Sequence, residues 1–453
     1  MRIAVVFLMA TGLVACAEIP PVVEAVKNGD TAALRALLAG KADVKAAEAD
    51  GATALHWASY RDNVEAAVLL LRAGAKVNAA NDLGATPLWI ASQNGSAGMV
   101  RRLLDAGANP NAALLAGETP VMVAARSGYP EIVEQLIARG ANVNVRGSRG
   151  QTALMWAVSQ KHPDVVKVLL AHGADLQARS DVWNDVEAVP PHGYLPYNRA
   201  IPHGNETALL FAARVGDLAS AKLLVTAGAN VNDADAWGVT ATVLAAHSDF
   251  REIVDLLLDH GANPNTAPAG FTALHEAIMR RDEKMVSSLL AHGADPNTPL
   301  KTWTPMRRSS HDFHFDPQWV GATPFWLAAR FIEPAVMRLL VTKGADPLFV
   351  LRAEYVTGGR FEHRIEETTA LMAATGMGGG APWVQPPRVE REGLALEAAK
   401  LAIDLGVNIN AVDSHGSLAL DGAKALGYEG LIRFLVEKGA KSGKPYKKEA
   451  SPE

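Results

Sequence analysis

The sequence predicts an all-α solenoid of about ten or eleven helix-turn-helix units with long inserted loops. Two observations predict it. A short phrase recurs every 33 residues, and it opens on Gly51, Gly84, Gly117 and Gly150. A Gly-Ala pair recurs with the same period, at Gly74, Gly107, Gly140 and Gly173. Two patterns that share one period and keep a fixed offset are typical of stacked structural repeats.

Each unit carries the signals of two short helices. A threonine precedes the first apolar run, where its hydroxyl can accept a bond from a helix amide that lacks a partner. These threonines are Thr53, Thr86, Thr119 and Thr152. Proline follows at the first helical position in several units, as Pro87, Pro120 and Pro324. A second apolar run with helical spacing then ends at the Gly-Ala pair, whose glycine suits a left-handed residue. Neither helix can bury its apolar stripe alone, so the units must stack.

The phrase Thr53 to Ala58 (Thr-Ala-Leu-His-Trp-Ala) and the segment Leu69 to Asn78 resemble the ankyrin repeat. The resemblance runs from about Pro21 to Lys441, and we expect one solenoid over 18–441. It implies that His56 and His275 are structural and bond to the neighbouring turn. It also implies that the turn between units is a finger along a concave side. It is specific for the fold and says little about any one function.

The spacing of the threonines exceeds 33 at four places, which predicts inserts near 181–203, 299–320, 351–367 and 376–393. We place the first three in turns between units and the fourth between the two helices of one unit. The inserts hold many aromatic residues in a chain that is only 6% aromatic. We expect these rings to contact either the solenoid itself or a partner, and we take Trp303, Trp319 and Tyr355 as the partner candidates.

The inserts are also expected to differ in their neighbours. The second and third are one unit apart, so they should form one ledge. The first lies three units away and should be separate unless it reaches along the groove.

The N-terminus predicts an export signal over 1–17, because an apolar run from Ile3 to Val14 follows Arg2. The run is too short for a permanent membrane span. Leu13-Val14-Ala15-Cys16 resembles a bacterial lipobox, which implies that Cys16 is lipidated and anchors the protein. The alternative is an ordinary signal peptide cut after Ala17. Cys16 is the only cysteine, so no disulfide can form within the mature chain. Residues 442–453 are expected to be a disordered tail.

Candidate chemistry is sparse. The segment His311 to Asp316 has zinc or iron ligand types, but no second cluster matches it and two arginines precede it, so no metal is expected. The loop Gly376 to Gly380 could approach a phosphate through its amides, but no Lys-Ser/Thr follows, and a flexible hinge is favoured. No nucleophile motif occurs. We therefore expect no catalytic residue, no cofactor and no enzyme. The net charge of −5 gives no indication of nucleic-acid binding.

One charge pattern stands out. By the resemblance, two residues at the end of each first helix face the concave groove. Five of these eight pairs contain arginine and none contains an acidic residue. Guanidinium groups favour carboxylates and phosphates, so the groove is expected to take an acidic segment or anionic surface of a partner. The alternative is that the arginines pair with finger carboxylates such as Asp82, Asp235 or Glu118. The groove candidates are Tyr60, Arg61, Arg126, Arg214, Arg280 and Arg330.

These observations favour a non-enzymatic protein-interaction scaffold of the bacterial cell envelope. We expect it to be exported to the periplasm and lipid-anchored to the outer membrane, with a protein partner and no nucleic acid. The alternative is an accessory module of an envelope enzyme, in which the inserts form a small-molecule or cofactor pocket. A secreted effector is a third reading, which lipidation would oppose.

Overall fold

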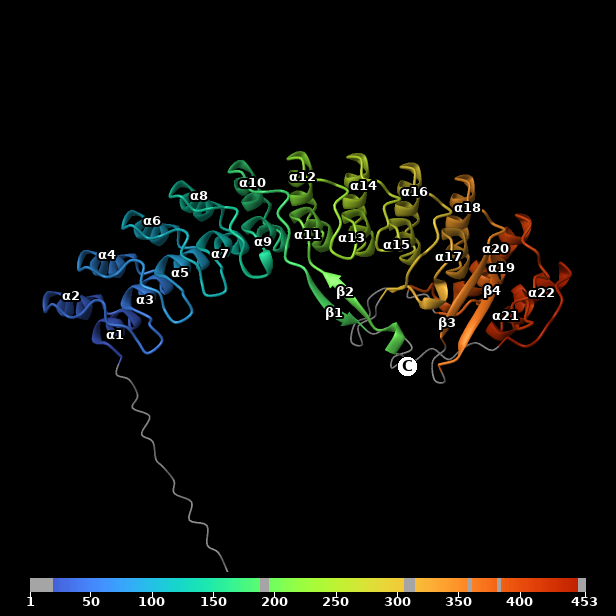
Figure 1. The fold of residues 1–453 in the computed structure, drawn as a ribbon, viewed down its shortest axis with the longest axis horizontal. Coiled ribbons are helices and arrows are strands. Elements are labelled where there is room, and N and C mark those ends of the chain that lie inside the picture. The colour runs from blue at the N-terminus through green and yellow to red at the C-terminus, as the bar shows by residue number, and fades with distance from the viewer. Residues whose placement is uncertain (1–18, 188–194, 305–313, 357–360, 381–383, 447–453) are drawn as a thin grey trace, which may run out of the picture. The chain divides into compact units, whose positions relative to one another are not determined.

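The computed structural model describes residues 19–187, 195–304, 314–356, 361–380 and 384–446 (Figure 1). Over these ranges the chain forms 22 α-helices in eleven consecutive pairs, which confirms the predicted helical repeat fold. The chain divides into two compact units, Met1–Ala174 and Asp175–Glu453, here called unit 1 and unit 2.

Unit 1 contains five helix pairs. Their first helices are α1 (Pro21–Lys27), α3 (Ala54–Tyr60), α5 (Pro87–Gln93), α7 (Pro120–Ser127) and α9 (Ala153–Ser159). Their second helices are α2 (Thr31–Ala39), α4 (Val64–Arg72), α6 (Ala97–Asp105), α8 (Pro130–Ala138) and α10 (Pro163–Ala171). A short 3-10 turn, η1 (Ser148–Gly150), lies in the finger before α9.

Unit 2 contains six helix pairs. Their first helices are α11 (Ala208–Val215), α13 (Ala241–His247), α15 (Ala273–Met279), α17 (Pro324–Arg330), α19 (Ala370–Ala374) and α21 (Ala419–Leu426). Their second helices are α12 (Leu218–Thr226), α14 (Arg251–Asp259), α16 (Glu283–Ala291), α18 (Pro334–Thr342), α20 (Arg388–Asp404) and α22 (Glu429–Glu437). The inserts add η2 (Leu195–Tyr197), η3 (Pro317–Trp319) and four strands.

The core of each unit follows the sequence period. First helices contact first helices and second helices contact second helices, as α3 does with α5 and α4 with α6. Equivalent leucines of the second helices are fully buried in unit 1, namely Leu70, Leu103, Leu136 and Leu169. One leucine in each helix pair thus fills the space between neighbouring pairs, which is how repeats share a continuous apolar core.

The predicted threonine caps are confirmed in part. Thr86 and Thr152 accept from the amides of Trp89 and Met155. The later threonines Thr240, Thr272, Thr323 and Thr369 do the same in unit 2. Thr119 makes no such bond, and Thr53 is hydrogen-bonded to the His56 ring instead. The glycines predicted to end the second helices are left-handed, with φ of 92° at Gly74 and 88° at Gly140.

An asparagine ladder links neighbouring pairs. The Asn78 side-chain amide donates to the Gly107 carbonyl at 3.2 Å, and its carbonyl oxygen accepts from the Asn109 amide at 2.8 Å. The same two bonds are made by Asn111, Asn232, Asn265, Asn297 and Asn410. Gln177 and Leu348 occupy this position in the units that precede the first and third inserts.

Two β-hairpins, which were not predicted, accompany the helices. Strands β1 (Trp183–Glu187) and β2 (Arg199–His203) pair antiparallel in the first insert. Strands β3 (Val350–Val356) and β4 (His363–Thr369) pair antiparallel in the third. Each hairpin follows a unit that lacks the ladder asparagine. The second insert, which follows the retained Asn297, forms no strand within its described residues. Backbone pairing is therefore present at the two inserts where the side-chain ladder is interrupted.

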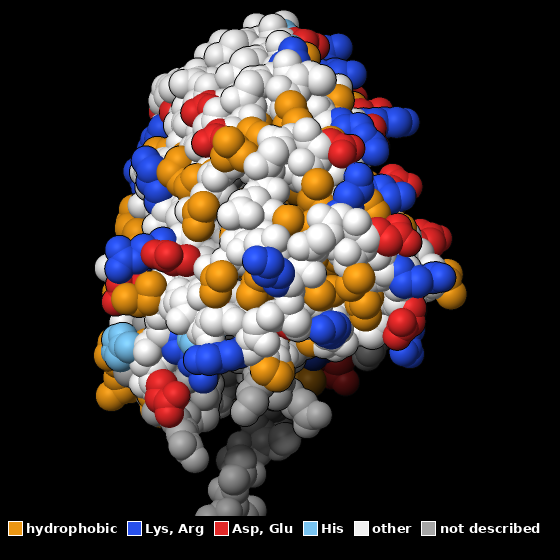
Figure 2. Space-filling view, turned by 90° about the vertical axis from the view of Figure 1, so that its right-hand side faces the viewer, with side chains coloured by type: hydrophobic (Ala, Val, Ile, Leu, Met, Phe, Trp, Pro, Cys, Tyr) orange, Lys and Arg blue, Asp and Glu red, His pale blue; other side chains and the backbone are white. Residues whose placement is uncertain are grey.

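The C-terminal part of unit 2 corrects two boundaries. Helix α20 begins at Arg388, so the last residues of the predicted fourth insert are helical. Ser442 and Gly443 hydrogen-bond to Asp421, and the Lys444 amide donates to the Gly416 carbonyl, so the chain up to Tyr446 is not the expected disordered tail. Figure 2 views the end formed by α21 and α22, where charged side chains flank scattered hydrophobic ones. A polar outer face is what the last unit of a repeat array requires.

The predicted signal over 1–17 lies outside the described residues. Among the helices that the structure describes, none has the length and apolarity needed to cross a membrane.

Candidate partner-binding surfaces

The end of α3 in unit 1 presents an exposed aromatic side chain. Tyr60 is 61% exposed, and its neighbour Arg61 is also exposed. The Tyr60 ring meets the Trp57 ring edge to face, with centroids 5.7 Å apart. Trp57 is itself held in place, because its indole N–H donates to Glu48 at 2.5 Å and Lys27 lies 4.3 Å from its ring. Tyr60 is therefore displayed on a fixed aromatic support.

Further half-buried apolar groups lie on the following helix pairs of unit 1. Ile90 and Leu114 pack against the buried cluster of Ala85, Trp89 and Val123. Trp156 on α9 is half-buried, and the Arg126 guanidinium lies 5.3 Å from its ring. We call the three rings of Trp57, Tyr60 and Trp156, together with Ile90 between them in the sequence, the aromatic column of unit 1. Trp57, Ile90, Val123 and Trp156 are each 33 residues apart. That spacing was the signal by which sequence analysis could have found the column.

Two predicted groove arginines are paired within the chain. The Arg126 guanidinium lies 2.6 Å from a Glu118 carboxylate oxygen, and Arg214 forms an ion pair with Glu206. Burial raises the pKa of both glutamates, while the arginine beside each lowers it. For Arg126 this is the pairing with Glu118 that the sequence left open. The positive charge of these two positions is largely neutralised.

Two other groove arginines are less accessible. Arg280 is half-buried, which lowers its pKa, and Asp249 and Glu276 oppose that effect. Arg330 is buried and donates from Nε and Nη2 to the Gly379 carbonyl at 3.0 and 2.9 Å, and also to the Gly380 carbonyl. This corrects Arg330 as a groove residue, because its guanidinium holds the loop of the fourth insert.

The three aromatic partner candidates are also corrected. Trp303, Trp319 and Tyr355 are all buried. Trp319 meets Phe331 edge to face at 5.2 Å, and its indole N–H donates to the Gly379 carbonyl at 3.3 Å. Tyr355 donates to Glu366 at 3.0 Å. Their position matches the alternative that the sequence left open, in which insert rings pack on the chain itself.

Each of the four inserts contacts at least one other insert. The Arg199 guanidinium of the first lies 4.7 Å from the Trp303 ring of the second, so the first insert reaches along unit 2. Strand β3 of the third contacts η3 of the second, as expected for one ledge. Gly379 and Gly380 of the fourth have positive φ, and a Cβ there would clash with Gln318 and Asp316. The glycine loop thus permits close packing and is not the free hinge that was expected.

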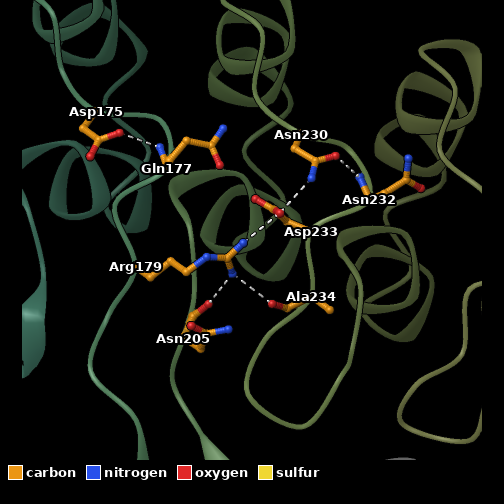
Figure 3. A network of polar contacts seen from close by, with 8 residues as sticks. All are labelled: Asp175, Gln177, Arg179, Asn205, Asn230, Asn232, Asp233 and Ala234. Carbon is orange, nitrogen blue, oxygen red and sulfur yellow. Dashed lines mark hydrogen bonds and ion pairs between the residues drawn. The ribbon is translucent and has the colours of Figure 1, made fainter.

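Arg179 joins the base of the first insert to the next unit (Figure 3). Its Nη1 donates to the carbonyls of Asn205 at 3.0 Å and Ala234 at 3.1 Å, and its Nη2 lies 2.8 Å from Asp233. Gln177, at the interrupted ladder position, donates its backbone amide to the Asp175 carboxylate at 2.8 Å. A planar fork that satisfies three acceptors takes the place of an asparagine bridge here. The signal for this role was the missing asparagine at 177.

The candidate histidine sites are structural. The His56 ring is hydrogen-bonded to Thr53 and to the Ala85 carbonyl at 2.9 Å, and the His275 ring to the Thr298 carbonyl at 3.1 Å. Burial lowers the pKa of His275 to about 4, so its ring is neutral. His311 and Asp312 lie outside the described residues. Within the described ones no three His, Cys, Asp or Glu side chains gather as a metal site.

Comparisons with known proteins agree with this architecture. A family model described as ankyrin repeats (3 copies) matches residues 22–114, 107–180 and 202–299, and one described as ankyrin repeats (many copies) matches 154–225. An ankyrin repeat protein of Fowlpox virus (strain NVSL) is 43% identical over 77 residues, which is 17% of this chain and 23% of that protein. An ankyrin repeat-containing protein of Treponema pallidum (strain Nichols) is 45% identical over 58 residues, which is 13% of this chain and 20% of that protein.

The chain therefore spans less than a quarter of the length of these two relatives. Among solved structures, the human ASB11 ankyrin repeat domain is 30% identical and covers 54% of this chain and 99% of its own, with a TM-score of 0.44. Proteins built from such repeats are generally non-enzymatic modules for protein–protein interaction. Because the family model matches more than half of its residues, the chain belongs to the ankyrin repeat family.

Proposed function

We propose that this chain is a non-enzymatic interaction scaffold of the bacterial cell envelope that binds a partner protein through the aromatic column of unit 1. The observation that carries the proposal is the exposed ring of Tyr60 on its support of Trp57. Tyrosine and tryptophan dominate the energetics of protein interfaces, since they bury much apolar surface at little cost in side-chain entropy. A rigidly held, exposed ring is therefore suited to anchor a partner.

The charge around the column narrows the partner's chemistry. Arg126 is already paired with Glu118, so it adds little net charge. Arg61 is exposed and lies directly beside Tyr60. A partner segment with an apolar anchor and an acidic residue next to it would contact both side chains. The sequence predicted that several groove arginines bind an acidic partner, and the structure-based proposal assigns that contact to Arg61 alone.

A photo-crosslinker placed at residue 60 tests the proposal directly. We expect Tyr60→p-benzoylphenylalanine to give a discrete protein adduct in cell envelopes. The control Arg72→p-benzoylphenylalanine, in α4, should give none. Adding Arg61→Glu should lower the adduct yield about tenfold, because one buried charge contact is worth about 1–3 kcal/mol. Arg72→Glu is the matched charge control. Equal adducts from positions 60 and 72 would reject the column as the binding surface.

The proposed envelope location rests on the sequence of Cys16 and the apolar run before it, which lie outside the described residues. Cys16→Ser should shift the protein from the membrane pellet to the supernatant and abolish labelling by radioactive palmitate. A wild-type chain that takes up no label would leave the ordinary signal peptide cut after Ala17. This result would leave the crosslinking test of the aromatic column unaffected.

No observation favours the alternative of a pocket for an envelope enzyme. Two polar side chains where the described parts of the inserts meet bond within the chain, since both Arg330 and Trp319 donate to the Gly379 carbonyl. Three of the insert rings, those of Trp303, Trp319 and Tyr355, are buried.

A further inference from the structure

The hairpin of the first insert offers a surface that the proposed function does not use. It is a two-stranded sheet, so β1 has β2 along one edge and no described strand along the other. Figure 1 shows it projecting from the start of unit 2 towards the third insert. An open strand edge presents unpaired backbone groups and can template an additional strand.

The hairpin is fixed from the β2 side. Ile201 of β2 is buried, and the Arg199 guanidinium of β2 lies 4.7 Å from the Trp303 ring. At its base, the Gly204 carbonyl accepts from the Ala236 amide at 2.9 Å. His203 stacks on Trp183 across the strands, with ring centroids 5.7 Å apart. The hairpin is therefore anchored on the repeats of unit 2.

The β1 side faces solvent. Every residue from 182 to 186 is exposed, including Val182 at 57% and Val186 at 74%. Because strand side chains alternate, Val182 and Val186 share one face of the hairpin and Asp185 lies on the other. Asp181 and Asp185 are both exposed, which gives this edge acidic character. The hairpin's described arginine, Arg199, is on the opposite strand.

We propose that β1 binds an extended segment of a partner protein as a third strand, and that this segment alternates apolar and basic residues. Main-chain bonds along β1 would supply affinity, as in other cases of strand addition. Apolar side chains of the incoming strand would lie beside Val182 and Val186. Basic ones would lie beside Asp185, since opposite charges on neighbouring strands stabilise the pair. This surface is separate from the aromatic column, so either can fail alone.

The test uses the mature full-length chain and a short fluorescent peptide in which valine alternates with lysine. Two further peptides carry N-methyl groups on alternate residues, one on each edge of the strand. We expect fluorescence anisotropy to show that one methylated peptide binds as the parent does and the other loses at least about tenfold in affinity. Only strand pairing distinguishes the two edges, because the charge of both peptides is the same.

Protein variants provide the second arm. Asp185→Lys should lower the peptide affinity about tenfold, whereas Asp82→Lys, the same change at an exposed finger of unit 1, should leave it unchanged. Hydrogen exchange should show protection of the 183–187 amides when the peptide is bound. Circular dichroism confirms that each variant is folded, and the methylated peptides test the unaltered protein in any case.

Three results would overturn the proposal. Equal binding of both methylated peptides, or equal loss in the two lysine variants, would indicate non-specific charge attraction. Equal binding of a valine–glutamate peptide would reject a basic partner. Sedimentation showing a dimer that excludes the peptide and is lost in Asp185→Lys would assign the edge to a second copy of this chain.

Discussion

Units 1 and 2 are built from the same repeat but treat their first-helix ends differently. In unit 1, α3 ends in the exposed pair Tyr60 and Arg61. At the equivalent end of α17 in unit 2, Arg330 and Phe331 are buried by the second and fourth inserts. The comparison teaches that a solenoid's capacity to bind depends on whether its own inserts already occupy the surface.

The inserts also change the kind of core that each unit has. The largest fully buried side chains are Trp319, Trp326, Phe315, Phe325 and Phe331, all at α17 and the second insert. The core of unit 1 consists mainly of leucine, valine, alanine and methionine. More buried apolar surface means greater local stability, so we expect unit 2 to be most resistant to opening around α17.

The largest expected effect is the loss of Trp319. Its side chain is fully buried, so Trp319→Ala should lower the free energy of unfolding of unit 2 by about 3–5 kcal/mol. Hydrogen exchange should show faster opening in α17 and in the third and fourth inserts. Trp57→Ala, at a half-buried ring of unit 1, should cost about 1–2 kcal/mol. Equal losses in the two variants would break the comparison between the units.

A pH-dependent effect comes next, from Glu333 at the start of α18. Burial raises the pKa of this carboxyl to about 8, although Arg281 lowers it. In the unfolded chain its pKa is near the ordinary glutamate value of 4.5. Between these values the folded state holds a proton that the unfolded state has lost. The free energy of unfolding should therefore fall as pH rises from about 4.5 to about 8.

Glu333→Gln should remove that dependence, because glutamine resembles the protonated acid. We expect the variant and the wild type to unfold equally at pH 4.5, and the variant to be more stable by about 2–4 kcal/mol at pH 8. Exchange of the α18 amides at several pH values measures it. Glu134→Gln, at an exposed position of α8, controls for the loss of a carboxylate. A constant difference between Glu333→Gln and wild type at all pH values would contradict the assignment.

Much of the fold could be predicted from the sequence because its signals are local and repeated. The 33-residue spacing located the helices, the caps at Thr86 and Thr152, and the left-handed Gly74 and Gly140. The same count predicted where the inserts lie, since a surplus of residues is visible without any structure, but the last residues of the fourth are the start of α20. Strand pairing was not predictable in this way, because β1 and β2 are joined across residues with no short turn motif.

The functional surfaces were harder to predict because accessibility depends on contacts between distant segments. Trp319 and Tyr60 are both aromatic residues that the sequence marked as partner candidates, and only packing shows that one is buried and the other exposed. Arg330 occupies the position equivalent to Tyr60, but the carbonyls that it binds come from Gly379 and Gly380, about fifty residues later. Composition identified the right residue types without revealing which of them the chain itself uses.

The smallest expected effect concerns the two ways in which units are joined. Arg179→Ala leaves three acceptors without their donor and should lower the free energy of unfolding by about 2 kcal/mol. Asn111→Ala removes one ladder residue and should lower it by about 1 kcal/mol. Local exchange near Asn205 and Ala234 reports the first, and near Gly140 the second. Arg179→Lys should not rescue, because an ammonium lacks the planar fork.

Placing an asparagine at 177 distinguishes two roles for Arg179. It either replaces the missing ladder asparagine or meets a separate requirement of the hairpin. In the regular ladder the acceptor is the glycine carbonyl of the next Gly-Ala pair, as Gly140 is for Asn111. Arg179 instead bonds to Asn205 and Ala234, at the base of the hairpin and in the next finger. Gln177→Asn should therefore not recover the stability lost in Arg179→Ala, because it offers bonds to different atoms. Full recovery would mean that Arg179 merely compensates for a lost asparagine, and that the hairpin places no demand of its own on the join.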